Sequence, residues 1–79
     1  MGDAREEWLV DLDLALKTLL RHEGVPVLDI QWLLVRCEDS RRVSGEMREA
    51  SLDQLVKDVK RFDTEFPGLL PRKLVSGLR

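Results

Sequence analysis

Cys37 and His22 are the side chains best suited to bind a metal ion, act as a nucleophile or act as a base. Each is the only residue of its type in the chain, and there is no CxxC, HExxH or glycine-rich phosphate loop. The carboxylates fall on the polar sides of predicted helices rather than as a pair held in a pocket. We therefore expect no catalytic residue, no metal site and no cofactor, and we predict that the protein is not an enzyme.

A single cysteine cannot form a disulfide within the chain, which is typical of an intracellular protein, nuclear or cytoplasmic. Cys37 lies among apolar residues, where a free cysteine usually behaves as a small hydrophobic side chain. A reactive or metal-binding thiol is the alternative. His22 lies at the end of a predicted helix, where we expect it to interact with that helix end.

The composition bounds the class of protein. A chain of 79 residues with 43% hydrophobic and 35% charged residues is typical of one small folded domain, which we assign to residues 1–79. The sequence has no apolar run of the roughly 18 residues that a membrane span requires, and we expect no secretory signal, because no basic stretch precedes an apolar one. We expect no association with a membrane.

The segment from Val25 to Cys37 is apolar on two opposite sides when it is drawn as a helix. One side carries Val27, Ile30, Leu33, Leu34 and Cys37, and the other carries Leu28, Trp32 and Val35. A helix of this kind either lies inside a core or buries its second side against another molecule. The segment therefore points to a binding surface.

Three further stretches have the features of helices. The first runs from about Ala4 to His22, with Gly24 as its stop, and the segment with two apolar sides follows from Pro26 or Asp29 to about Ser40. Residues 41–50 lack a clear period and are interpreted as a loop or a partly helical connection. Ser51 and Gln54 then form a capping box for a third helix that carries Leu52, Leu55, Val56, Val59 and Phe62.

A break at 66–68 precedes a short final helix, with Pro71 in its first turn and Gly77 near its end. The pattern predicts an all-α, compact four-helix domain in which the first two helices form an αα-hairpin. The predicted core consists of Leu12, Leu16, Leu19, Leu33, Leu34, Leu55, Val56 and Val59.

Five apolar residues lie outside the stripes that would form this core. They are Val10, Leu14, Leu28, Trp32 and Val35. One interpretation is a groove on the first two helices that binds a short amphipathic helix of another protein, or a second copy of the chain as a homodimer. The other is a central second helix, covered on both sides, with residues 69–78 as a lid.

The order of the elements resembles the small helical hub domains. Two amphipathic helices, a third that ends in Phe62, and then Phe66-Pro67-x-Leu69-Leu70 are similar to the paired amphipathic helix and harmonin-homology domains, although Phe66 stands where the former have histidine. The resemblance implies a scaffold that binds short helices of transcription or repair factors between its first two helices.

A small winged-helix domain that binds nucleic acid is the rival interpretation. It would use a short strand at Val25–Val27, and its basic residues are Arg41, Arg42, Lys57, Lys60 and Arg61. The net charge of −2 and the absence of a visible strand pair for a wing argue against it. We therefore expect a protein partner rather than nucleic acid.

Overall fold

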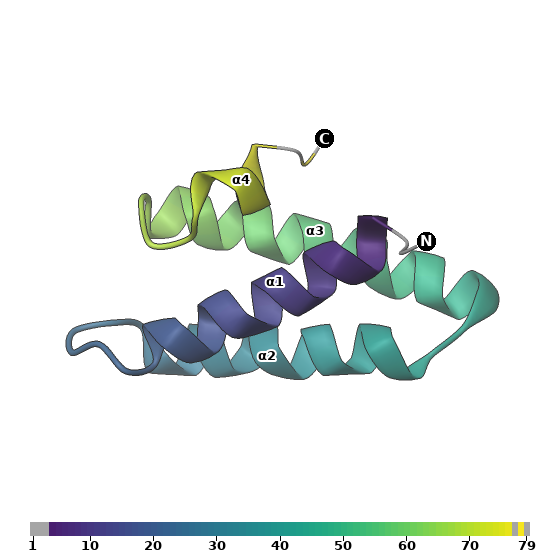
Figure 1. The fold of residues 1–79 in the computed structure, drawn as a ribbon, viewed down its shortest axis with the longest axis horizontal. Coiled ribbons are helices and arrows are strands. Elements are labelled where there is room, and N and C mark those ends of the chain that lie inside the picture. Colours follow the sequence, from purple (N-terminus) through teal and green to yellow (C-terminus); the bar gives the residue numbers. More distant parts are fainter. Residues whose placement is uncertain (1–3, 77, 79) are drawn as a thin grey trace.

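The computed structural model describes residues 4–76 and 78, which contain four helices and no strand. α1 spans Ala4–Leu19, α2 spans Val27–Arg42, α3 spans Gly45–Glu65 and α4 spans Arg72–Val75. The three long helices run in alternating directions (Figure 1), so α1 and α2 form an antiparallel hairpin. α2 packs against both α1 and α3, and the short α4 packs against α1 and α3. The predicted all-α class is confirmed.

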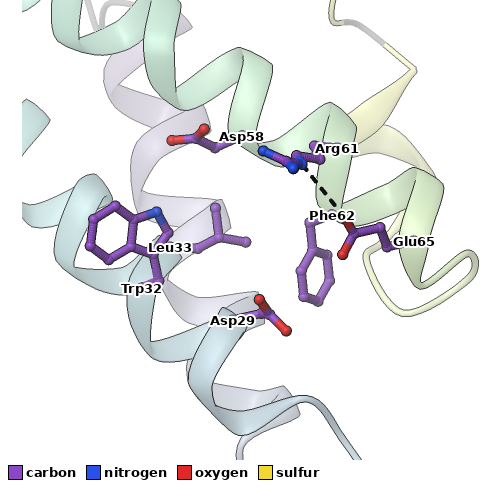
Figure 2. Close-up of a pocket in the computed structure, with 7 residues that line it drawn as sticks. All are labelled: Asp29, Trp32, Leu33, Asp58, Arg61, Phe62 and Glu65. Atoms are coloured by element: carbon purple, nitrogen blue, oxygen red, sulfur yellow. Dashed lines mark ion pairs between the residues drawn. The ribbon is translucent and has the colours of Figure 1, made fainter.

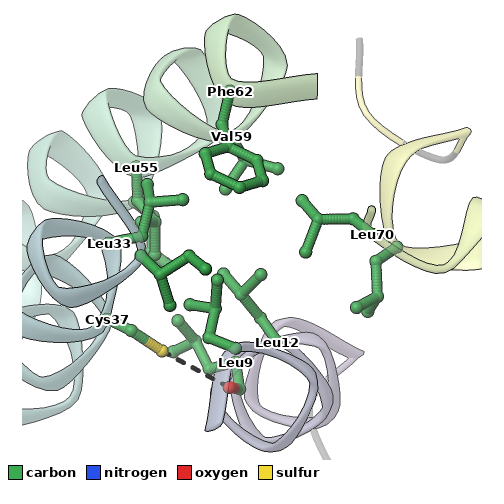
Figure 3. Close-up of a cluster of buried hydrophobic side chains, with 12 residues drawn as sticks. Leu9, Leu12, Leu33, Cys37, Leu55, Val59, Phe62 and Leu70 are labelled. Atoms are coloured by element: carbon green, nitrogen blue, oxygen red, sulfur yellow. Dashed lines mark hydrogen bonds between the residues drawn. The ribbon is translucent and has the colours of Figure 1, made fainter. Parts of the chain in front are cut away.

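The core lies where the inner sides of the helices meet (Figure 3). Of the predicted core residues, five are buried: Leu12, Leu16, Leu33, Leu55 and Val59. The prediction was wrong for Leu19, Leu34 and Val56, which are only partly buried. Leu19 is the last residue of α1, and Val56 faces a surface hollow that it shares with Trp8 and Leu78, so neighbouring helices cover neither completely.

The first helix ends earlier than predicted because its last turn tightens. α1 ends at Leu19, and the amides of Arg21 and His22 then donate hydrogen bonds to the carbonyls three residues before them, at 3.1 and 3.0 Å. Such bonds satisfy carbonyls that the end of an α-helix leaves free. Gly24 follows with a φ of 78°, a conformation that favours glycine, and the chain reverses there into α2.

The second helix begins at Val27, with Pro26 at the N-cap position and Asp29 in its first turn. Ile30, Leu33 and Cys37 are buried on its inner side as predicted. Val27 was placed on the same side, but it is 45% exposed. As the first residue of α2 it lies at the margin of the region that the other helices cover.

The third helix begins seven residues before the predicted start, since its N-cap is Ser44 rather than Ser51. Residues 45–50 are helical, so the interpretation of 41–50 as a connection holds only for its short gap between Arg42 and Gly45. These first turns carry good helix-forming residues, and Arg48 and Glu49 form ion pairs with Glu6 and Arg5 of α1. Polar contacts with α1, rather than an apolar stripe, accompany this extension, which explains why the hydrophobic pattern did not predict it.

Ser51 is therefore not an N-cap, and Ser44 occupies that position. Ser51 lies inside α3, and its Oγ is 2.7 Å from Oγ of Ser40, a wholly buried residue of α2. This pair is the hydrogen bond that satisfies a buried hydroxyl at the α2–α3 contact.

Ser51→Ala is expected to lower the free energy of unfolding by about 1 kcal/mol, because Ser40 Oγ loses its partner. Ser40→Ala should lower the free energy of unfolding less in the Ser51→Ala variant than in wild type, since the two hydroxyls act as a pair. Ser51→Asp, which a true N-cap would tolerate, should do no better than Ser51→Ala. Urea unfolding of the four variants measures this, and additive losses would mean that the two serines are independent.

The final helix covers α1 and α3 rather than α2. α4 begins after Pro71, close to its predicted place, and Leu70 and Leu74 are buried in the core. The indole N–H of Trp8 donates a 2.9 Å hydrogen bond to the carbonyl of Leu74, which fixes α4 on α1. The predicted end at Gly77 lies outside the described residues. The alternative of a central α2 covered on both sides is wrong, because the outer side of α2 is left open.

Candidate functional site

All five residues of the candidate partner surface are exposed. Their exposed fractions are 48% for Val10, 64% for Leu14, 81% for Leu28, 56% for Trp32 and 52% for Val35. We call Leu28, Trp32 and Val35 the outer face of α2, because the helix turns its opposite side, with Leu33 and Cys37, into the core. The apolar residues that the core did not need therefore lie on the surface of the molecule.

The structure divides these residues between two places. Trp32 lines a hollow between α2 and α3, whereas Val10 lines a shallow hollow with acidic residues of α1 alone. Neither hollow joins the α1 residues to the α2 residues. The outer face of α2 is thus the larger apolar part of the predicted surface, and the hollow that borders it has α3 as its second wall.

The α2–α3 hollow has a volume of about 240 Å³. In Figure 2, Trp32 stands on one side and Phe62 on the other, with Asp58 and Asp29 at opposite ends and Leu33 between them. Arg61 and Glu65 complete the lining as an ion pair, with Nε 3.5 Å from Oε1. Aromatic side walls and acidic ends give this hollow a mixed apolar and anionic character.

Arg36 connects the outer face of α2 to this hollow. Its guanidinium carbon lies 5.1 Å from the ring centroid of Trp32, within the range of a cation–π contact. Its Nε lies 3.6 Å from Oδ2 of Asp58, and the other Asp58 oxygen accepts a 3.1 Å hydrogen bond from Gln54 Nε2. Arg36 thus lies between the exposed indole of α2 and the carboxylate of α3.

Sequence reasoning missed the residues of α3 that complete the hollow. Asp58 and Phe62 line the same hollow as Trp32 only because α2 and α3 pack together, and the spacing along the chain carries no local signal of that packing. The acidic residue of α2, Asp29, was interpreted only as a possible helix cap. It lies in the first turn of α2 and lines the hollow.

The five basic residues do not form one patch. Arg41 and Arg42 are at the end of α2, whereas Lys60 and Arg61 lie near the far end of α3, about 20 Å along that helix from its start. Two of the five are matched by acids one turn away, since Arg42 pairs with Glu38 and Arg61 with Glu65. The strand expected at Val25–Val27 is also absent, because Val27 is already helical. The winged-helix interpretation is wrong in its fold.

Cys37 is wholly buried, as expected of a small hydrophobic side chain, and its Sγ donates a hydrogen bond to the carbonyl of Leu9 at 3.4 Å. Burial raises the pKa of the Cys37 thiol from 9.0 to about 11, and the Asp13 carboxylate adds to the rise. His22 is exposed in the turn after α1. Within residues 4–76 and 78, no three potential ligands gather into a metal-binding group.

The raised pKa of Cys37 predicts a loss of stability at high pH. Above pH 9 the thiol of the unfolded chain ionises while the folded chain keeps its proton, so unfolding becomes more favourable until about pH 11. The loss should reach about 2–3 kcal/mol over that interval. Urea unfolding of wild type and Cys37→Ala at each pH measures it. The two proteins differ only at residue 37, so equal pH dependence of the two would contradict the prediction.

None of the helices in the described part of the chain is long and apolar enough to cross a membrane. Comparison with known protein families, with curated proteins and with solved structures found no match. The assignment of function therefore depends on the geometry of the surface.

Proposed function

We propose that the protein is a non-enzymatic protein–protein interaction module that binds an amphipathic helix through an apolar surface on α1 and α2. The observation that carries this proposal is the outer face of α2, where three large apolar side chains lie next to one another in the open. Large apolar groups gathered on the surface of a small protein are characteristic of interaction sites. Tryptophan beside aliphatic residues is a frequent composition of binding hot spots.

The spacing of the outer face supports a helix as the partner. Leu28, Trp32 and Val35 follow one another at intervals of four and three residues, the spacing that forms a seam between two packed helices. An amphipathic helix aligned with α2 would cover all three side chains and exclude water from the indole. Val10 and Leu14 of α1 are also exposed and form a second, separate apolar part of the proposed surface.

The likeness in element order to the helical hub domains agrees with this mode of binding and favours a nuclear or cytoplasmic partner. A second copy of the chain is the other occupant that an apolar helix face accepts. Sedimentation of the purified protein distinguishes a partner helix from a second copy, because the apparent mass of a homodimer rises with protein concentration and that of a monomer does not.

Selection of displayed amphipathic peptides on the immobilised protein tests the proposal. Wild type should enrich peptides with an apolar stripe, and Trp32→Ala should lose their binding. Met47→Ala is the matched control, because Met47 is 70% exposed but lies on α3 outside the proposed surface. If the sedimentation shows a monomer and no enriched peptide depends on Trp32, the proposed function is wrong.

A further inference from the structure

The hollow between α2 and α3 has a composition suited to a cation. Trp32, which is 56% exposed, forms one side wall. Only the edges of Phe62 and Leu33 reach the hollow, since they are 4% and 2% exposed, and the carboxylates of Asp29 and Asp58 lie at its two ends (Figure 2). Aromatic surfaces pack well against the methylene stem of a long basic side chain, while carboxylates attract its charge. The hollow borders the outer face of α2 through Trp32, so a helix bound there would pass its rim.

The charges around the hollow leave one carboxylate without a matching cation. Arg61 is paired with Glu65 at 3.5 Å, and Arg36 is paired with Asp58 at 3.6 Å. Asp29 forms no ion pair with any residue that the structure describes. One unmatched negative charge at the end of an aromatic slot is complementary to one positive charge.

The volume favours a single side chain over a separate small molecule. Pockets for drug-sized ligands measure about 300–1,000 Å³. This hollow, at about 240 Å³, falls below that range and is open along its rim.

We propose that the α2–α3 hollow binds a lysine or arginine side chain of the partner helix, with its stem along the exposed indole of Trp32 and its charge at Asp29. This inference rests on the proposed function and specifies the partner: an amphipathic helix with a basic residue beside its apolar stripe. The basic residue would fix the register and direction of the helix on α2, since an apolar stripe alone permits several registers and both directions.

The test uses the peptides enriched on the wild-type protein. Most should carry a lysine or arginine next to the apolar stripe, and Asp29→Asn should weaken their binding roughly fivefold at low salt. Asp39→Asn removes the same charge from another exposed position of α2 outside the hollow, and should change the affinity much less. Replacing the peptide's basic residue by norleucine should remove the difference between wild type and Asp29→Asn.

Each contrary outcome identifies which proposal fails. Enriched peptides without a basic residue, or equal effects of Asp29→Asn and Asp39→Asn, overturn the cation site. The interaction module is still supported in that case if binding depends on Trp32. A homodimer that dissociates on Trp32→Ala and excludes peptides replaces the proposed occupant by a second copy. Binding that ignores Trp32 overturns the interaction surface and the cation site together. Circular dichroism of each variant verifies that it is folded.

Discussion

Leu16→Ala and Leu55→Ala are each expected to lower the free energy of unfolding by about 2–5 kcal/mol, because each leaves a cavity in a wholly buried site. Leu16 of α1 and Leu55 of α3 are both part of the single buried cluster that joins the helices. A domain of this size has a total stability of only about 5–10 kcal/mol, so either variant should unfold at a much lower urea concentration than wild type. Urea unfolding followed by circular dichroism measures the loss.

Leu14→Ala is the matched control for this prediction. It makes the same substitution on α1 at a side chain that is exposed rather than buried. It should change the stability by no more than about 0.5 kcal/mol. If Leu16→Ala unfolds at the same urea concentration as Leu14→Ala, the inner and outer sides of α1 are assigned wrongly.

Trp32→Ala is expected to separate binding from folding. The indole is more than half exposed and contacts Arg36, so its truncation should change the free energy of unfolding by no more than about 1 kcal/mol. The same change should weaken binding of an enriched peptide by about 2 kcal/mol or more, which is roughly thirtyfold. A thermal melt and a fluorescence titration on the same samples measure the two effects.

A tryptophan in the core would behave in the opposite way. Truncation of such a residue costs roughly 3–5 kcal/mol of stability. Trp8 provides the comparison within this chain, because it is partly buried and its indole donates to the carbonyl of Leu74 in α4. Trp8→Ala should therefore destabilise the fold more than Trp32→Ala, and the reverse order would contradict the placement of the two indoles.

The helical spacing of the apolar residues predicted the helices correctly wherever a helix buries one side in the core. Leu12 and Leu16, Leu33, and Leu55 and Val59 all lie buried as their spacing indicated. It failed at 45–50, where the first turns of α3 are joined to α1 by ion pairs between long side chains. Intrinsic helix propensity, which those residues have, was the better guide there.

The apolar residues on the outer face of α2 could be predicted because they exceed what a small core can bury. The hollow beside them could not be predicted, since it forms only when α2 packs on α3, which brings Arg36 to Asp58 and places Trp32 across from Phe62. The Ser40–Ser51 hydrogen bond is a further example, because a capping-box pattern at Ser51 suggested a different role. The hydrophobic pattern of the sequence indicates which side of each helix is buried, but it does not indicate which other helix packs against that side.

The most direct test of the interaction surface is a chemical-shift map of the protein with and without an enriched peptide. The indole N–H of Trp32 and the methyl groups of Leu28 and Val35 are expected to shift most. A map centred instead on the hollow beside Trp8, which measures about 300 Å³ and is bordered by Leu74 and Leu78, would contradict the proposed surface. The binding site would then lie where α4 packs against α1.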